Sequence, residues 1–443
     1  MIPIFRSNEP QAKRYLTRAP IEPASLPDPV KERLIRAFGQ ALDAEEAVHR
    51  IIEEVKRGGD AALLRLTELL DGCRPAHLRV EPAALEAAWR ELDPAARQAM
   101  ELAAARIRRF HSRQQAHSWL VWEGGGALGQ LIQPIESVGV YVPGGRAPLV
   151  STVLMTAIPA QVAGVKRLCL CSPPQRPTGQ PHTAILAAAH MLGVQEVYAV
   201  GGAQAIAAMA FGTQSLPRVD KIVGPGNLFV ILAKKQLYGQ VGIDGLPGPT
   251  ETVVIADDAA SPALVAADLA AQAEHDPLAK PLLLTTSESL AQAVNKELEQ
   301  ELGTGSLSAA AAECLQRQAA AILCQDLQEA LALANEFAPE HLCLSVRDPW
   351  PLLPFVRHAG GVFLGEHMCE SLGDYIAGPS HVMPTGGTAR FSSPLSVWDF
   401  VKICSVFALG PEEARSLGSA AATLAALEGL QAHRRAILLR AGG

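Results

Sequence analysis

The sequence has no C-x-x-C pair and no regular spacing of cysteines. Its 443 residues include eight cysteines, which are scattered at positions 73, 169, 171, 314, 324, 343, 369 and 404. A disulfide framework needs a denser and more regular set in a smaller chain. We therefore expect reduced thiols and a cytoplasmic protein.

Basic charge and long apolar runs are also scarce. The formal net charge is -7, without the basic excess of a nucleic-acid-binding surface, so we expect no nucleic-acid partner. The most apolar stretch, from Leu149, is broken by Pro159 and is shorter than the ~20 residues of a membrane span. The first residues, MIPIFRSNEPQAKRYL, carry charges where a signal peptide needs its apolar segment. These features predict neither export nor a membrane span.

The composition that remains is that of a globular protein, with 49% hydrophobic and 19% charged residues. Residues 28–114 have the apolar spacing of amphipathic helices. After Trp122 and again from Thr250, short β-rich runs alternate with helical runs, which predicts two α/β units with mostly parallel sheets. Residues 373–387 are rich in Gly and Pro and predict a long loop, and the chain beyond Phe400 is expected to be helical.

Three glycine turns in the first alternation are candidate phosphate cradles. They are VPGGRAP with Gly144 and Gly145, VGGAQA with Gly201 and Gly202, and VGPGN with Gly224 and Gly226. None matches G-x-G-x-x-G, because Phe229 stands where a third glycine would be, and glycine ends strands in every α/β protein. Three such turns in one unit nevertheless favour a nucleotide over purely structural turns.

The stretch DLAAQAEHD predicts an alanine-rich helix on which Gln272 and His275, three positions apart, share one face. These two side chains are either a partial metal site or an ordinary polar face, since glutamine is an uncommon zinc ligand. Further candidate ligands are Asp374, in the predicted loop, and His433, five residues after Glu428 on the predicted C-terminal helix.

The stretch APEHL contains a third candidate group. Pro339 disfavours helix at Ala338, so Glu340 and His341 are expected in a helix-to-strand connection. A carboxylate beside an imidazole is either an acid/base pair or a solvated loop pair.

Taken together and in order, these segments resemble the histidinol dehydrogenase family over nearly the whole chain. The motifs that carry the resemblance are YVPGG, SPP, GGAQAIAA, VGPGN, VGID with GPTE, ADLAAQAEHDP, APEHL, LGDYIAGPSHVMPTGGTARF, PLSV and EGLQAH. The resemblance implies a zinc-dependent enzyme that oxidises L-histidinol to L-histidine in two NAD-linked steps through a bound aldehyde, the last steps of histidine biosynthesis. It also implies a homodimer whose active sites are shared between subunits.

The resemblance also assigns roles to residues. Zinc, one ion per subunit, would be held by Gln272, His275, Asp374 and His433, and Glu340 and His341 would be catalytic. Tyr141, Gln204 and Asn227 would contact NAD. The positions expected to hold the substrate are Thr250, Gln272, His275, His341, Asp374, His381, Glu428 and His433.

The expected fold is two incomplete Rossmann-like α/β domains in series with helical extensions at both ends. We expect a helical arm over 1–30, a helical part over 31–120 that packs with 250–395 as the first, zinc-binding and catalytic, domain, and an NAD-binding domain over 121–249. A helical tail over 396–443 is expected to contribute to the partner subunit's site.

The sequence departs from the family pattern at a few positions. Thr250 stands where serine is common, Phe211 and Phe229 stand where tyrosine is common, and PLVST replaces a tyrosine-proline-serine segment at Pro148. The alternatives are therefore a related zinc and NAD dehydrogenase of another small amino or sulfonated alcohol, a zinc hydrolase, and a non-catalytic binding protein. The intact EGLQAH favours histidinol, because Glu428 supplies an anion for an ammonium group.

Overall fold

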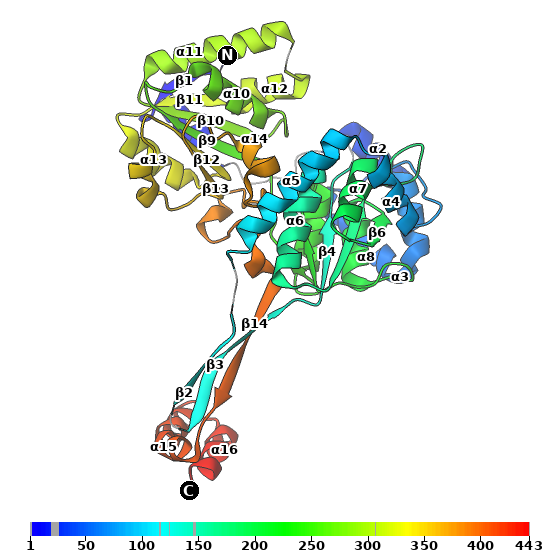
Figure 1. The fold of residues 1–443 in the computed structure, drawn as a ribbon, viewed down its shortest axis with the longest axis vertical. Coiled ribbons are helices and arrows are strands. Elements are labelled where there is room, and N and C mark those ends of the chain that lie inside the picture. Colours follow the sequence, from blue (N-terminus) through cyan, green and yellow to red (C-terminus); the bar gives the residue numbers. More distant parts are fainter. Residues whose placement is uncertain are drawn as a thin grey trace.

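The computed structural model describes residues 2–18, 26–114, 117–123, 125–144, 148–305 and 307–442. Figure 1 shows two α/β units side by side, from which a narrow stalk leads to a pair of helices near the C-terminus. In the part of the chain that the structure describes, no helix is long and apolar enough to cross a membrane.

The first α/β unit contains a six-stranded parallel sheet in the order β1-β11-β10-β9-β12-β13. Its central strands are buried along their whole length, because helices cover both faces. The strands are β1 (Ile4–Arg6), β9 (Glu251–Ala256), β10 (Lys280–Thr285), β11 (Ala320–Leu323), β12 (His341–Ser345) and β13 (Gly361–Leu364). The helices are α1 (Pro10–Leu16), α10 (Pro262–Ala273), α11 (Glu288–Thr304), α12 (Ala309–Gln318), α13 (Leu327–Phe337) and α14 (Glu370–Leu372).

The second α/β unit contains a five-stranded parallel sheet in the order β6-β5-β4-β7-β8. Numbered within each unit, both sheets have the Rossmann-like order 3-2-1-4-5, and β1 is added beside the third strand of the first unit. The prediction of an α/β fold with parallel sheets is thus confirmed. The elements are β4 (Ser137–Tyr141), α6 (Val150–Ala163), β5 (Arg167–Ser172), α7 (Thr183–Met191), β6 (Glu196–Ala199), α8 (Gly202–Phe211), β7 (Lys221–Val223), α9 (Leu228–Leu237) and β8 (Gly242–Ile243).

The N-terminal helices pack on the second unit, not on the first as expected. The apolar face of α3 shares a core with α8 and α9, α4 packs on α7, and α5 packs on α6. The end of this region also touches the first unit, where α5 meets the turn at Gly373–Ala377. The four helices are α2 (Asp28–Phe38), α3 (Ala44–Leu70), α4 (Pro82–Glu91) and α5 (Pro94–His111).

Both ends of the chain differ from the helical extensions that were expected. The N-terminal arm begins with β1, which completes the edge of the first sheet, before α1. The C-terminal tail begins with β14 (Val401–Ala408), which pairs antiparallel with β3 (Gly126–Pro134) and through it with β2 (Trp119–Glu123). This three-stranded stalk carries α15 (Pro411–Leu427) and α16 (Gln431–Ala441) (Figure 1). A strand pattern that is exposed on both faces lacks the alternation from which strands are recognised.

A buried ion pair holds one glycine turn of the second unit. Nζ of Lys234, on α9, lies 2.7 Å from Oδ1 of Asp244, and the two side chains are 1% and 3% exposed. The same ammonium donates to the carbonyl of Gly224 at 2.5 Å, and the other Asp244 oxygen accepts the Gly224 N–H at 2.7 Å. Removing one charge would leave the other buried without its partner.

We expect Lys234→Met to lower the free energy of unfolding by about 3–5 kcal/mol, the usual cost of breaking a buried pair from one side. Lys234→Met with Asp244→Asn should recover part of this loss, because the amide oxygen can still accept the Gly224 N–H. Urea unfolding followed by circular dichroism measures both variants. The matched control is Lys235→Met, whose exposed pair with Glu45 should contribute under about 1 kcal/mol. Equal losses for Lys234→Met and Lys235→Met would contradict this prediction.

Candidate active site

The candidate catalytic residues meet at the amino edge of the first sheet. Strands β9 and β12 are neighbours, and Thr250 and Glu340 immediately precede them. The Thr250 hydroxyl donates to Oε2 of Glu340 at 2.6 Å and lies 3.1 Å from Oε1 of Gln272. Strand pairing thus brings together residues that are ninety positions apart in the sequence.

The local backbone explains why Glu340 and His341 lie at this edge. Helix α13 ends at Phe337, and its C-cap residue Ala338 has a left-handed conformation with φ of 50°. Pro339 then prevents the helix from continuing, and the chain enters β12 at His341. The predicted helix-to-strand connection is confirmed, but its two polar side chains are buried rather than solvated.

Burial changes the protonation of both residues in opposite directions. Desolvation raises the pKa of Glu340 to about 8, against the opposing effect of hydrogen bonds from Thr250 and the Glu251 backbone. Desolvation lowers the pKa of His341 to about 3, and the nearby charges of His275 and His381 act in the same direction. His341 is therefore a neutral imidazole at neutral pH.

The ring of His341 has no hydrogen-bond partner at either nitrogen, although both nitrogens are buried. Its Nδ1 lies 3.8 Å from Oε2 of Glu340 and 3.9 Å from Oε2 of Glu370. Buried polar atoms are normally hydrogen-bonded, so a free buried imidazole points to a missing ligand. An imidazole with unbonded ring nitrogens can accept a proton from a substrate and so act as a general base.

Glu370 is a buried residue of this site that the sequence interpretation did not include. It lies in α14, is 2% exposed, and accepts hydrogen bonds from Cys343 Sγ and from Thr252 Oγ1, each at 3.0 Å. Desolvation raises its pKa well above the usual value. No local signal distinguishes it, because a glutamate in the first turn of a helix is ordinary in sequence.

The three metal-ligand candidates of the α/β body come from two elements. Gln272 is buried near the end of α10, which ends at Ala273. His275 therefore follows the helix rather than lying on it, but a turn in which its N–H donates to the Gln272 carbonyl at 3.2 Å keeps it close. Asp374 lies in a π-helical turn, Gly373–Ala377, within the segment predicted to be a loop.

The charges of the metal-ligand candidates act on the candidate catalytic residues. The charge of Asp374 raises the pKa of Glu340, though less than burial does, and burial raises the pKa of Asp374 itself to about 6. Desolvation lowers the pKa of His275, which keeps it neutral as a metal ligand must be. Among the described residues, no three His, Cys, Asp or Glu side chains form a possible metal site. One chain supplies only an amide, an imidazole and a carboxylate.

Glu428 and His433 do not join these residues within one chain. Both are exposed: Glu428 is the C-cap residue of α15 and His433 lies in α16, the two helices at the far end of the stalk (Figure 1). They were expected on one helix, but Gly429, with φ of 74°, separates α15 from α16. Glycine takes this left-handed conformation without the steric penalty of a side chain, so the helix ends here.

The glycine turns gather at the carboxyl edge of the second sheet, where they follow β4, β6 and β7. Gly145 of the first turn lies outside the described residues. At Gly224 the φ is 114°, and a Cβ would lie 2.2 Å from the carbonyl oxygen of Tyr141, so only glycine fits. This edge contains the topological switch point between β4 and β7, where open α/β sheets bind ligands.

The three NAD-contact candidates flank these turns: Tyr141 ends β4, Gln204 lies in the first turn of α8, and Asn227 precedes α9. The hydroxyl of Tyr141, which is 4% exposed, accepts the Gly202 N–H at 3.2 Å, and burial raises its pKa. Gln204 is also buried, and its amide donates to Asp71 at 3.1 Å. Asn227 caps α9 by accepting the N–H groups of Phe229 and Val230. The structure thus explains how these side chains shape the turns.

His381 contacts residues at the carboxyl edge of the second sheet and near the amino edge of the first. Its Nδ1 lies 3.0 Å from the Asp374 carbonyl oxygen, and its Nε2 lies 3.3 Å from Oγ1 of Thr152 at the start of α6. Desolvation lowers the pKa of His381 to about 4. The contact joins the carboxyl edge of the second sheet to the amino edge of the first. A cavity of about 690 Å³ lies between the units, lined in part by Asp244, Gly360 and Ser380.

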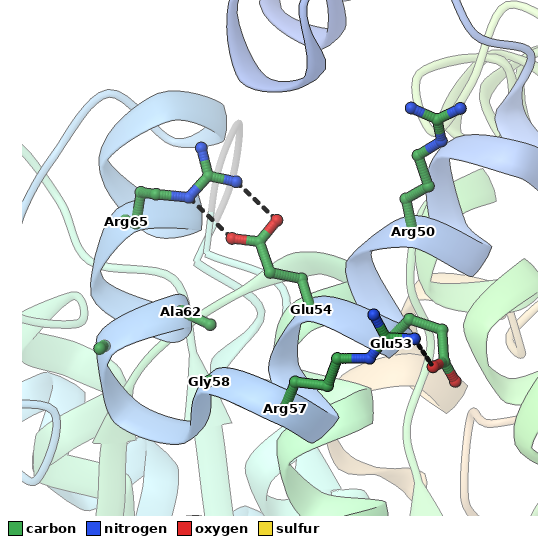
Figure 2. Close-up of a pocket in the computed structure, with 8 residues that line it drawn as sticks. Arg50, Glu53, Glu54, Arg57, Gly58, Ala62 and Arg65 are labelled. Atoms are coloured by element: carbon green, nitrogen blue, oxygen red, sulfur yellow. Dashed lines mark hydrogen bonds and ion pairs between the residues drawn. The ribbon is translucent and has the colours of Figure 1, made fainter.

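A second cavity, of about 560 Å³, lies away from this site at the kink in α3. The kink arises at Gly59, whose backbone is not helical. Figure 2 shows the pairs of Arg65 with Glu54 and of Arg57 with Glu53, which lie 2.6 Å and 3.2 Å apart. Arg50, drawn there without a partner, pairs with Glu46 at 2.9 Å. These guanidinium groups are already neutralised by neighbours on the same helix, so the cavity is not a strong anion site.

Known proteins resemble this chain over most of its length. The family model for histidinol dehydrogenase matches residues 36–441. The histidinol dehydrogenase of Deinococcus radiodurans is 54% identical over 429 residues, which cover 96% of this chain and 97% of the relative. That of Thermus thermophilus is 51% identical and covers 89% of this chain and 94% of the relative.

A solved structure agrees with these sequence comparisons. The crystal structure of histidinol dehydrogenase from Elizabethkingia anophelis superposes with a TM-score of 0.89 at 34% identity, covering 99% of this chain and 98% of that one. With the arrangement of both sheets and both edges described above, these matches identify the chain as an oxidoreductase that belongs to the histidinol dehydrogenase family.

Proposed function

We propose that this chain oxidises L-histidinol to L-histidine through bound L-histidinaldehyde, with NAD as acceptor and one zinc ion per subunit, as the last steps of histidine biosynthesis. The observation that carries the proposal is the free, neutral imidazole of His341 beside the buried carboxyl of Glu340. The family and the names of its relatives support histidinol as the substrate.

Gln272, His275 and Asp374 would hold the zinc ion together with His433 of the partner subunit. The donor chemistry fits, because a neutral imidazole and a buried carboxylate both gain from a nearby cation. When bound, zinc would supply coordination positions for the ring nitrogen and amine of the substrate and so orient it.

NAD would bind where the glycine turns of the second unit meet, with Tyr141, Gln204 and Asn227 around it, and would accept the two electrons of each step. The start of α8 at Gly202, which has no side-chain cap, suits a pyrophosphate. His381, joined to α6 through Thr152, lies where the cofactor unit meets the catalytic unit.

The proton transfers fall to two residues of this chain. His341 accepts the proton of the substrate hydroxyl, for which its neutral ring and free nitrogens are suited. Glu340, in the ionised form that is the minor one at neutral pH because burial raises its pKa to about 8, then takes a proton from the water that adds to the aldehyde, so that a second oxidation can follow. Thr250 orients Glu340 through its 2.6 Å hydrogen bond, and Glu428 of the partner subunit would attract the substrate ammonium group.

The sharing of sites within a homodimer is supported by the exposed apolar surface of the stalk and its helices. Soluble monomers rarely expose so many large apolar side chains in one region. Separate from the α/β units, such an arm gains stability by packing on a partner. The exposed residues are Trp119, Leu120, Val121, Trp122, Leu128, Leu131, Ile403, Phe407, Leu417, Leu424, Leu427, Leu430 and Leu439.

The direct test of the function measures NADH formation by the purified protein. We expect turnover with L-histidinol to exceed that with a panel of other small amino and sulfonated alcohols. Chelation should abolish turnover while the circular dichroism spectrum is kept, and added Zn²⁺ should restore it. A faster reaction with another alcohol would show that histidinol is not the preferred substrate. Full activity in a metal-free sample would show that zinc is not required.

Variants of the acid/base pair should separate the two half-reactions. Glu340→Gln is expected to slow oxidation of supplied histidinaldehyde more than oxidation of histidinol to the aldehyde. His341→Asn should slow proton transfer by roughly 10²- to 10⁴-fold, as loss of a general base does. Single-turnover kinetics with each substrate measures both. A normal rate of aldehyde oxidation by Glu340→Gln would show that its assigned role is wrong.

Mixed dimers should show whether sites are shared. His275→Asn and His433→Asn chains should each be nearly inactive alone. When they are unfolded together and refolded, random pairing makes half of the dimers mixed, and one of the two sites in each mixed dimer carries neither change. Activity should return to about a quarter of the parent value. If mixed dimers form and stay inactive, the tail of each chain contributes His433 to the site of the same chain.

A further inference from the structure

The N-terminal arm, residues 2–18, lies outside the 36–441 match to the family model but is built into the catalytic unit. Strand β1 pairs in parallel with β11 at the edge of the first sheet. The hydroxyl of Ser7 donates to Glu329 on α13 at 2.7 Å, and the Lys280 ammonium donates to the Thr17 carbonyl at 3.1 Å. These contacts hold the arm along the sheet up to Arg18.

Arg18 joins two segments of the unit that are far apart in sequence. Its Nε and Nη2 each donate to one oxygen of the Glu251 carboxylate, both at 2.7 Å. Nη2 also donates to the carbonyl of Ala338 at 3.2 Å. The guanidinium lies 4.1 Å from the ring centre of Phe337, a stacked arrangement that further restrains it.

Each of these segments carries one member of the acid/base site. Glu251 directly follows Thr250, and Ala338 stands two residues before Glu340. The Thr250 hydroxyl is bonded to Glu340 at 2.6 Å, so Arg18, which bonds the Glu251 side chain and the Ala338 backbone, links the same two segments a second time. Ala338 is, among the described residues, the only non-glycine with positive φ, a conformation that needs support from its surroundings.

A single planar side chain is needed for this bridge. The Glu251 side chain is 7% exposed, and a buried carboxylate is costly unless it is paired and hydrogen-bonded. Arginine offers two parallel donors to the carboxylate and a further donor to the carbonyl, whereas lysine offers a single ammonium. The bridge therefore requires the planar set of N–H donors of a guanidinium group and not only its positive charge.

We infer that Arg18 is a positioning residue of the active site, which sets the placement of Thr250 and Glu340 through Glu251 and Ala338. This inference rests on the proposed histidinol oxidation. Arg18 touches neither substrate nor cofactor in this role. Its loss should affect the rate of the chemical steps and not the binding of NAD.

The experiment compares Arg18→Ala, Arg18→Lys and the control Ser7→Ala in the full-length protein. Ser7→Ala loosens the same arm from the same helix without touching either bridged segment. We expect Arg18→Ala to lower kcat by roughly 10- to 100-fold, as small misplacements of catalytic groups do, with KM for NAD changed less than about twofold. Added guanidinium at millimolar concentration should restore part of kcat, whereas methylammonium should not. Arg18→Lys should resemble Arg18→Ala.

A second measurement is independent of turnover. Hydrogen exchange read by mass spectrometry should be faster in Arg18→Ala, but not in Ser7→Ala, for peptides that cover residues 248–256 and 336–345. Unchanged exchange and unchanged kcat in Arg18→Ala would overturn the inference. If the parent protein does not oxidise histidinol, the proposed function fails, and the exchange data still decide whether Arg18 holds these two segments.

Discussion

The parallel pairing of β9 with β12 is the constraint on which the site depends. Because the two strands start at the same edge, Thr250 and Glu340 reach hydrogen-bond distance, and His341 follows at the first position of β12. The pairing also buries Glu340 and His341 next to Gln272 and Glu370, while Thr250 is half-buried. A one-residue shift in the register of β12 would turn Glu340 and His341 each to the other face of the sheet, so the same strand pairing that builds the core also determines the chemistry.

Desolvation shifts the pKa values of Glu340 and His341 in opposite directions. The same low-polarity surroundings raise the pKa of Glu340 to about 8 and lower that of His341 to about 3, since burial disfavours the charged form of each. The site thereby holds a protonated carboxyl and a neutral imidazole within 3.8 Å. Glu370, which is also near the imidazole, accepts a hydrogen bond from Cys343, so both residues belong to the same buried cluster. Such perturbed groups are typical of catalytic sites.

The arrangement of the two units departs from the usual rule for α/β sheets. The second unit follows that rule, because its glycine turns lie at the carboxyl edge beside the switch point. The first unit, with the same strand order, uses its amino edge instead. The contact of His381 with Thr152 brings these unlike edges together, as the proposed positions of cofactor and substrate require.

The sequence alone determined most elements of the two α/β units, the family and the residue types of the site. Strong local signals were responsible: continuous apolar runs in the strands, glycine turns after them, and Pro339 ahead of His341. The family resemblance selected Gln272, His275, Asp374 and His433 as zinc ligands, an assignment that stays a prediction.

Only the tertiary structure decided which helices cover which sheet, that β1 belongs to the first sheet, and that the tail begins as a stalk strand. It also revealed Glu370, the burial of Glu340 and the bridge from Arg18. The physical reason is the same for all of them. Burial and long-range pairing arise from contacts between residues tens to hundreds of positions apart, and local periodicity contains no information about those contacts.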